Sequence, residues 1–438
     1  MFTRRTMLMK LALGAAGVAS GAVPFRLANS STPRSAFLSA RDDAFLDEIS
    51  RDSFSLFWEH AHPRTGLVKD LVVPGENKIN SVASIASTGF GLTALCIGAE
   101  RGWVDRSEAL ARAKATLRFL WNGMPHQNGF FYHFVDWQNG ERAMMCEVSS
   151  IDTAILICGV LSCRQYFGDE EVAELATRIY GRVDWSWLYR DGPHISHGWT
   201  PERGFLASSW DSYSEHMMLY LLAIGSSDHA IPAASWNAWR RPIRSFAGRQ
   251  YIEAPAPLFI HQYSHAWVDF RGQRDEFTDY FENSKTATLA HREFCLELSQ
   301  KYPSYGENLW GITASESPKG YAVWGGPPMM GDIDGSVVPS AAGGSLVFAP
   351  NETLQTLRHM RERHERQSWT RYGFADAFNP LTQWTARHLV SINTGITLVM
   401  AENARSGLVW DHFMQNPEIK AAMRRVGFSG ANDLFVTS

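Results

Sequence analysis

The chain has 438 residues and a formal net charge of −4, and 45% of its residues are hydrophobic. A chain of this composition can bury a large core, which excludes global disorder. It carries no basic stripe and no acidic tail, so we expect neither a nucleic-acid partner nor a strongly basic one. The sequence also has no GxGxxG motif and no P-loop, and we predict no cofactor.

The amino terminus is typical of a twin-arginine export signal. Arg4 and Arg5 precede a mildly apolar run at 11–19, and a Ser/Pro-rich stretch follows. The run is too short and too rich in Ala and Gly for a membrane span, and no other segment is apolar enough to cross a bilayer. We predict a signal and linker over 1–34 and a periplasmic or secreted mature protein without stable membrane insertion.

The five cysteines are odd in number and lack CxxC spacing, so they cannot form a complete disulfide framework. Most lie in apolar helical stretches, where a thiol serves as a small buried side chain. One disulfide remains possible in an oxidising compartment. The cysteines are Cys96, Cys146, Cys158, Cys163 and Cys295.

Helical periodicity recurs along nearly the whole chain. It predicts helices at 42–60, 82–101, 105–121, 149–167, 169–182, 212–225, 231–247, 276–302, 351–366 and 396–406. Ser149 with Asp152, and Ser212 with Glu215, have the spacing of capping boxes.

Longer loops rich in Gly, Pro, Trp and Asp separate alternate helices, at 61–81, 122–146, 183–210, 249–275, 303–350 and 367–393. Strand-like alternation is confined to short pieces such as 130–134. Paired helices joined by a long loop at every second connection suggest an all-α toroid whose loops gather on one face and form a cleft. No Pro/Ser linker divides the mature chain, so we predict a single domain over 35–438.

Two acids stand at the start of strongly apolar helices. Glu147 precedes Ser149 and therefore lies outside that capping box, whereas Asp152 has a capping role. Glu215 precedes an all-apolar run at 217–224, which must be buried, so this carboxyl group is desolvated. Two such acids in one cleft are the minimum equipment of a glycosidase.

Asp211 and Glu215 are four residues apart and would share a helical face. A capping role for Glu215 and a catalytic role are equally open from the residues alone. Trp210 and Tyr213 beside them favour a sugar subsite, because aromatic faces suit the apolar faces of sugar rings. The sequence holds 16 Trp, 25 Phe and 13 Tyr, and Trp267, Trp310 and Trp324 lie in loops. Packing of each loop Trp onto the domain is an equally good explanation.

The segment 261–271 is dense in polar and aromatic residues. His261 and His265 have the spacing of paired zinc ligands, but the glutamate of an HExxH motif is missing, so we predict no metal. We expect its His, Gln and Arg side chains to bind sugar hydroxyls. A purely structural pair between Asp269 and Arg271 is the alternative.

The longest loop contains a second polar group of candidates. Asp332 and Asp334 have the start of a calcium-loop pattern without the remaining ligands, so turn formation is the better interpretation. The Gly, Pro and aromatic content of the loop favours an ordered binding wall.

Seven segments run in a fixed order over about 45–425: EVSSIDTA (147–154), YSEHMMLYLLA (213–223), HQYSHAWVDFR (261–271), YGENLWGITAS (305–315), DGSVVPSAAGGSL (334–346), YGFADAFN (372–379) and ENARSGLVW (402–410). Together they resemble the bacterial glycoamylase-like family, which includes endo-β-1,2-glucanases of glycoside hydrolase family 144 and the related domain of cyclic β-1,2-glucan synthases. The resemblance covers nearly the whole mature chain.

This resemblance implies an (α/α)6 toroid and hydrolysis of β-1,2-glucan, with Glu147 and Glu215 on the family's essential acids. We expect His265, Arg271, Trp310 and Asp334 to form sugar subsites. One position departs from the family: Asn393 in INTGI (392–396) stands where an aspartate is expected. An amide cannot act as a base.

We therefore predict an exported, monomeric hydrolase of β-glucan that inverts the anomeric centre, with Glu215 as general acid and Glu147 as the partner carboxylate. The predicted substrate-binding residues are Asp211, Tyr213, His261, His265, Asp269, Arg271, Trp310, Asp334 and Asn393. The alternatives are a transglycosylase on β-1,2-glucans and a glucan-binding protein without catalysis, which Asn393 would favour.

Overall fold

The computed structural model describes residues 38–76, 81–190, 192–253 and 257–430. These residues are mostly helical, and their strands are two to four residues long. The predicted export signal over 1–34 lies outside the described residues. Within the described ranges, no helix is both long enough and apolar enough to cross a membrane.

The longer helices fall largely within the predicted spans, except α17, which was not predicted. They are α2 (Ala40–His60), α3 (Ile85–Glu100), α4 (Arg106–Asn122), α5 (Ser150–Phe167), α6 (Glu170–Gly181), α8 (Met217–Gly225), α11 (Tyr280–Leu298), α13 (Pro350–Arg363), α15 (Ser391–Arg405) and α17 (Pro417–Arg425). Local caps explain the agreement. Ser149 accepts a hydrogen bond from the Asp152 N–H at the start of α5, and Asp169 accepts two at the start of α6.

The shorter helices are α7 (Trp185–Tyr189), α9 (Ser235–Ala238), η1 (Leu258–His261), α10 (Tyr263–Trp267), α12 (Pro339–Gly343), α14 (Glu365–Ser368) and α16 (Leu408–Phe413).

The helix predicted over 231–247 is wrong. After α9 the chain forms a hairpin of β9 (Ile243–Phe246) and β10 (Arg249–Ile252). Pro242 cannot continue a helix, and Ala247 and Gly248 both have positive φ, which matches the right-handed twist of a two-residue hairpin turn.

The all-α expectation therefore needs a correction, since short antiparallel strands tie the loops together. The other strands are β1 (Leu71–Val72), β2 (Val82–Ser84), β3 (His126–Gln127), β4 (Phe130–Phe131), β5 (Phe134–Asp136), β6 (Val148–Ser149), β7 (Gly198–Thr200), β8 (Gly204–Phe205), β11 (Gln273–Arg274), β12 (Ser315–Ser317), β13 (Gly320–Ala322), β14 (Trp369–Thr370), β15 (Gly373–Phe374), β16 (Phe378–Asn379), β17 (Trp384–Thr385), β18 (Leu389–Val390) and β19 (Ser429–Gly430). Long loops that pack on a core must satisfy their buried backbone N–H and C=O groups, and the hydrogen bonds between these short strands do so.

Two of these pairings shape the ends of core helices. Strands β6, β7 and β8 form a three-stranded sheet in which Val148 pairs with Trp199, immediately before α5. Strand β2, which leads into α3, pairs with β5. The short strands therefore fix the loops that precede α3 and α5.

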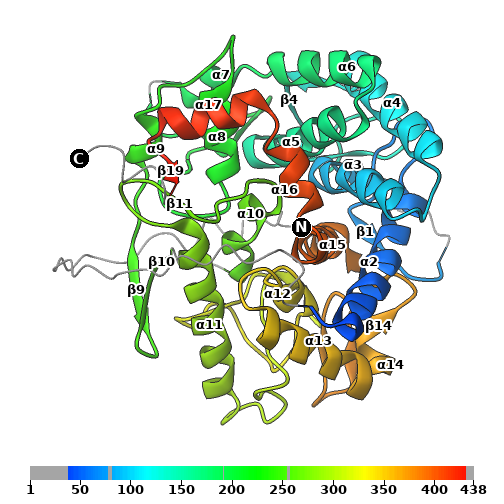
Figure 1. Ribbon diagram of the computed structural model, residues 1–438, viewed down its shortest axis with the longest axis vertical. Helices are drawn as coiled ribbons and strands as arrows, with labels where there is room; N and C mark the ends of the chain where they lie inside the picture. Colours follow the sequence, from blue (N-terminus) through cyan, green and yellow to red (C-terminus); the bar gives the residue numbers. More distant parts are fainter. Residues whose placement is uncertain (1–37, 77–80, 191, 254–256, 431–438) are drawn as a thin grey trace.

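Helix α15 lies near the centre of the molecule, with the other helices around it (Figure 1). It packs on α2, α3, α10, α12 and α16. Its buried Glu402 accepts two hydrogen bonds from Arg101, at 2.9 and 2.8 Å, which compensate the buried charge.

Helices α3 and α5 form an unusually close pair. Gly159 on α5 meets the backbone of Gly89 on α3, and a Cβ at position 159 would lie 2.1 Å from the Gly89 carbonyl oxygen. Both helices are buried along almost their full length, which requires the near-continuous apolar sequence that they have.

All five cysteines are buried free thiols, as predicted for small core side chains. Cys96 of α3 and Cys163 of α5 place their sulfur atoms 3.8 Å apart within the same helix pair.

Candidate active site

Glu147 lies in the chain segment that enters β6, and its side chain is only 6% exposed. Its backbone carbonyl accepts a hydrogen bond from the His133 N–H at 2.9 Å, so the loop containing His133 runs directly beside it. Gly198 of β7 packs against the same residue, since a Cβ there would lie 3.0 Å from Glu147 Cγ and 2.2 Å from the Val148 carbonyl oxygen. The sheet therefore fixes Glu147 from two sides.

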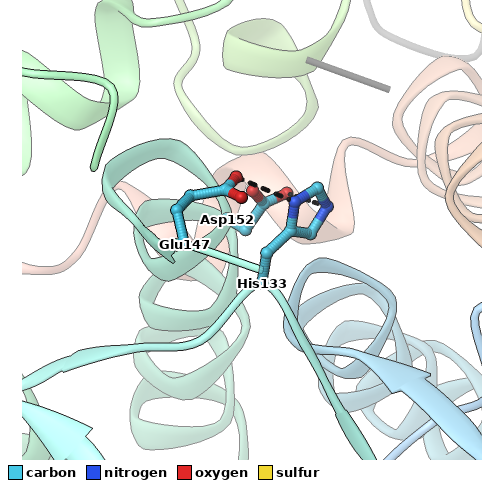
Figure 2. Close-up of side chains that lie close together, drawn as sticks. All are labelled: His133, Glu147 and Asp152. Carbon is cyan, nitrogen blue, oxygen red and sulfur yellow. Dashed lines mark hydrogen bonds and ion pairs between the residues drawn. The ribbon is translucent and has the colours of Figure 1, made fainter. Parts of the chain in front are cut away.

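Three polar side chains converge at the start of α5. His133 Nδ1 and Glu147 Oε1 are 3.1 Å apart within hydrogen-bonding geometry, and His133 Nε2 lies 3.6 Å from Asp152 Oδ1. Figure 2 shows the three side chains pointing toward one another at the end of this helix. All three are buried, and their ligand-type atoms lie within 4.8 Å of one another. Among the described residues, this group of three side chains could hold a metal ion. The hydrogen bond between His133 Nδ1 and Glu147 Oε1 already engages one possible ligand atom of each residue.

Glu215 occupies the turn before α8 and is also 6% exposed. Because α8 begins at Met217 and not at Ser212, the predicted capping box is wrong. The Glu215 carboxylate instead accepts a hydrogen bond from the neighbouring Ser214 hydroxyl. Ser264 fixes the turn, since its hydroxyl donates to the Glu215 carbonyl at 2.7 Å and accepts from the Met218 N–H at 3.0 Å.

Trp210 connects the two acid-bearing segments. Its indole N–H donates to the Ser150 hydroxyl at the start of α5, at 2.9 Å, and its carbonyl accepts from the Tyr220 hydroxyl of α8, at 3.0 Å. Its ring also packs on His216, with centroids 5.5 Å apart. Helices α5 and α8 pack on each other, so both acids precede neighbouring core helices.

Asp211 is the most accessible of the predicted sugar-binding residues near Glu215. Its side chain is 48% exposed, and Oδ2 lies 3.0 Å from Arg240 Nη2. Tyr213, in contrast, is fully buried, and its hydroxyl lies 3.0 Å from His261 Nδ1. The backbone between Asp211 and Tyr213 thus turns from the surface into the core.

The structure corrects the prediction of direct sugar contact at four positions. These residues have no exposed surface: Tyr213, His261, His265 and Trp310. His265 Nε2 lies 3.0 Å from the Ser284 hydroxyl, and the backbone N–H of Trp310 donates to Thr356 Oγ1 at 3.3 Å. Trp267 and Trp324 are buried too, so packing onto the domain explains all three loop tryptophans. These side chains support the fold from within the core.

The buried histidines make stability depend on pH. Desolvation, reinforced by nearby His261, lowers the pKa of His265 to about 3, and desolvation lowers that of His291 to about 4. The unfolded chain takes up these protons near the ordinary value of 6.5, so the folded state is favoured fully above that pH. Stability is then lost as the pH falls from about 6.5 toward the folded-state values.

We therefore expect the melting temperature to fall steadily between about pH 7 and about pH 4, as followed by circular dichroism. The His265→Gln variant should show a shallower fall over this window, because one of the titrating groups is gone. A melting temperature that stays level over the same window would contradict this expectation.

Asp269 and Arg271 form the structural pair considered as the alternative. The guanidinium of Arg271 donates to both Asp269 carboxylate oxygens, at 2.8 and 2.7 Å, and lies 4.1 Å from the centroid of the Trp410 ring. Both side chains keep some exposed surface, at 19% and 31% respectively. The pair is available to solvent, but its polar atoms are mutually engaged.

Asp334 forms a turn, as its pattern predicts. Its carboxylate accepts from the Ser336 N–H at 2.9 Å, and its carbonyl accepts from the Asn379 amide at 3.1 Å. The Asp334 side chain thus holds the loop that leads into α12.

Asn393 sits in the first turn of α15 and contacts an acid that the sequence analysis did not single out. Its amide donates to Asp376 Oδ1 at 2.8 Å and to the Ala314 carbonyl at 3.0 Å. Asp376 is buried and also accepts from the Glu316 N–H at 2.7 Å. With Ser340 and Thr394, these two residues line a small cavity. The signal for Asp376 was its place inside the segment 372–379.

Comparison with known proteins places this geometry in a family. The glycoamylase family model, described as "Putative glucoamylase", matches residues 207–417. A solved structure from Bacteroides fragilis with the same description is 30% identical, covers 91% of this chain and 100% of its own, and has a TM-score of 0.81. An endo-β-1,2-glucanase from Chitinophaga pinensis, solved with sophorotriose and glucose, is 29% identical, covers 90% and 99%, and has a TM-score of 0.83.

A curated relative from Parabacteroides distasonis is an exo-β-1,2-glucooligosaccharide sophorohydrolase acting at the non-reducing end. It is 27% identical over 88% of this chain, and the chain spans 58% of that relative's length. The two structural matches each cover at least 90% of this chain. The chain thus belongs to the glycoamylase family.

Proposed function

We propose that this protein is a glycoside hydrolase that cleaves β-glucan, with β-1,2-linked glucose as its substrate. One observation carries the proposal: two buried carboxylic acids, Glu147 and Glu215, precede the neighbouring core helices α5 and α8. Relatives that match nearly the whole chain act on β-1,2-linked glucans. The β-1,2 linkage is thus the substrate that the similarity supports best.

The two acids differ in their surroundings, and this supports different roles. Glu215 stands at the start of the fully buried, all-apolar helix α8, a setting that suits the general acid. Glu147 is hydrogen-bonded to His133, which favours the ionised form and suits a partner that activates water. Inversion requires the two carboxyl groups to be about 6.5–9.5 Å apart, which leaves room for the attacking water.

The packing order supports an (α/α)6 toroid as the scaffold. Helix α3 packs on α5, α5 on α8, α8 on α10, α10 and α12 on α15, and α15 on α3. Gln262, just before α10, closes the remaining step by donating to the Ala341 carbonyl of α12 at 2.9 Å. These six helices would form the inner ring of a single domain, with the acids on the loops at one end.

Export through the twin-arginine pathway belongs to the same proposal. Arg4 and Arg5 with the apolar run behind them support it. A periplasmic or secreted location would bring the enzyme to extracellular glucan, and fractionation of cells that produce the full chain tests it.

The deciding experiment measures reducing ends released from β-1,2-, β-1,3- and α-1,4-glucans. We expect release from the β-1,2-glucan and little from the other two. No release from any glucan would contradict the proposal. Longer or cyclic products in place of free oligosaccharides would instead support a transglycosylase, and tight glucan binding without turnover would support the binding-only alternative that Asn393 suggests.

A further inference from the structure

His133 occupies a position that the proposed reaction does not by itself explain. It is 3% exposed, and its ring stacks on Phe134 with centroids 3.8 Å apart and planes 16° apart. Its carbonyl accepts from the Ile85 N–H at the start of α3, at 3.3 Å, while its N–H bonds the Glu147 carbonyl. The ring is therefore fixed in place and orientation between two carboxylates (Figure 2).

The two carboxylates meet different nitrogens of the ring. Glu147 Oε1 lies at 3.1 Å from Nδ1, a hydrogen-bond distance, whereas Asp152 Oδ1 lies at 3.6 Å from Nε2, which is an ion-pair contact. The other Asp152 oxygen accepts a hydrogen bond from the Ser149 hydroxyl at 2.5 Å. Asp152 is thus anchored to the start of α5 through Oδ2, and its Oδ1 lies on the side of the ring.

With Glu147 ionised, this arrangement allows one proton pattern. An ionised carboxylate only accepts hydrogen bonds, so His133 Nδ1 carries the proton that joins the two residues. The Asp152 carboxylate lies on the far side of the ring, at Nε2, and so fixes the ring's orientation toward Glu147. A hydrogen bond to the charged form of a buried acid keeps that acid ionised.

The neighbouring ionisable groups do not compete for this role. Burial raises the pKa of the Cys146 thiol to about 12, so it stays neutral, and its sulfur accepts from the Phe134 N–H at 3.2 Å. Arg142 binds both oxygens of Glu202, at 2.5 and 3.0 Å, and points its Nε at the Cys146 carbonyl. Lys69, on the segment bonded to β2, places its ammonium 4.6 Å from the Trp137 ring centroid.

A further ring lies on the β7 side of α5. His197 packs on Trp210 with centroids 4.1 Å apart, and its carbonyl accepts from the Ser150 N–H at 3.1 Å. It is thus engaged with the segment that carries Glu215.

We propose that His133 is a positioning residue that holds Glu147 in its ionised form, and that Asp152 in turn holds His133. The inference rests on the proposed hydrolase function and deepens it, because it makes Glu147 the base and leaves the acid role to Glu215. The reacting water would be activated by Glu147, and His133 would not touch the substrate.

The test measures kcat/KM on β-1,2-glucan as a function of pH for wild type, His133→Gln and Asp152→Asn. In His133→Gln we expect the acid limb to move to higher pH by about one to two units, because a charge-assisted hydrogen bond is lost. Asp152→Asn keeps the acceptor for Ser149 and removes only the charge, so we expect a smaller move in the same direction. KM should change little in both.

The matched control is His126→Gln, a histidine of the same loop whose ring packs on Phe131 and accepts from the Gly129 N–H. Its profile should follow that of wild type. If His133→Gln lowers the rate by the same factor at every pH, the residue has only a structural role and the inference fails. An inactive wild type would count against the proposed function instead.

A second measurement does not need activity. Thermal unfolding of wild type, His133→Gln, Glu147→Gln and the double variant gives a double-mutant cycle. We expect coupling between the two residues at about pH 7 and weaker coupling at a second, lower pH at which Glu147 is protonated. The inference is overturned if each substitution changes the stability by the same amount whether or not the other substitution is present, at both pH values.

Discussion

Replacing Glu215 with glutamine is expected to lower kcat on β-1,2-glucan by about two to four orders of magnitude, which is the usual contribution of a general acid. The amide has the same shape but cannot protonate the glycosidic oxygen. The surrounding turn should survive, because Ser264 holds it through the backbone of residue 215 and through the Met218 N–H. KM should stay close to that of wild type, and initial-rate measurements over a range of glucan concentrations separate the two constants.

The control for this change is Glu174→Gln on α6, an exposed glutamate that pairs with Arg178 of the same helix. It should keep the wild-type rate. A Glu215→Gln enzyme that retains more than about a tenth of wild-type kcat would rule out the acid role, because even a modest general acid contributes more than that.

The second large effect concerns the fold. Gly159→Ala should lower the free energy of unfolding by about 3 kcal/mol, at the upper end of the range for overpacked cores. The new methyl group would lie 2.1 Å from the Gly89 carbonyl oxygen and 2.8 Å from its carbonyl carbon and Cα. These are backbone atoms, so relief requires the whole of α3 to move away from α5. Thermal unfolding followed by circular dichroism measures the loss.

Gly181→Ala is the matched control, because Gly181 is also a helical glycine and lies at the end of α6. A Cβ there meets nothing closer than Asp228 Oδ2 at 3.7 Å. Alanine is the better helix former by about 1 kcal/mol, so this variant should be as stable as wild type or slightly more stable. Equal melting temperatures for the two alanine variants would show that α3 can shift without cost.

Some features of the site could be predicted because they are local. The Ser149 cap and the burial of the run after Glu215 depend on residues within a few positions of one another. The capping box predicted at Ser212 is wrong because distant residues decide the backbone there. The chain turns inward at Tyr213, whose hydroxyl contacts His261, and the backbone at Ser212 and Tyr213 pairs with Arg240 and does not enter the helix.

Other features depend on residues far apart in the chain. The amide of Asn393 in α15 meets Asp376 and the carbonyl of Ala314, which come from two separate loops. No periodicity or spacing relates these positions. The same holds for His133, which the sequence presents as one residue of an aromatic loop.

The sequence by itself determined where the main helices lie and which acids stand at their starts, because apolar periodicity and caps act over one or two turns. Tertiary structure alone decided which polar and aromatic residues face solvent. It buried Trp310 and His265, and it set His133 between Glu147 and Asp152. The physical reason is that burial and contact depend on how remote segments pack, and a tryptophan or histidine has the same local pattern in a core as in a cleft.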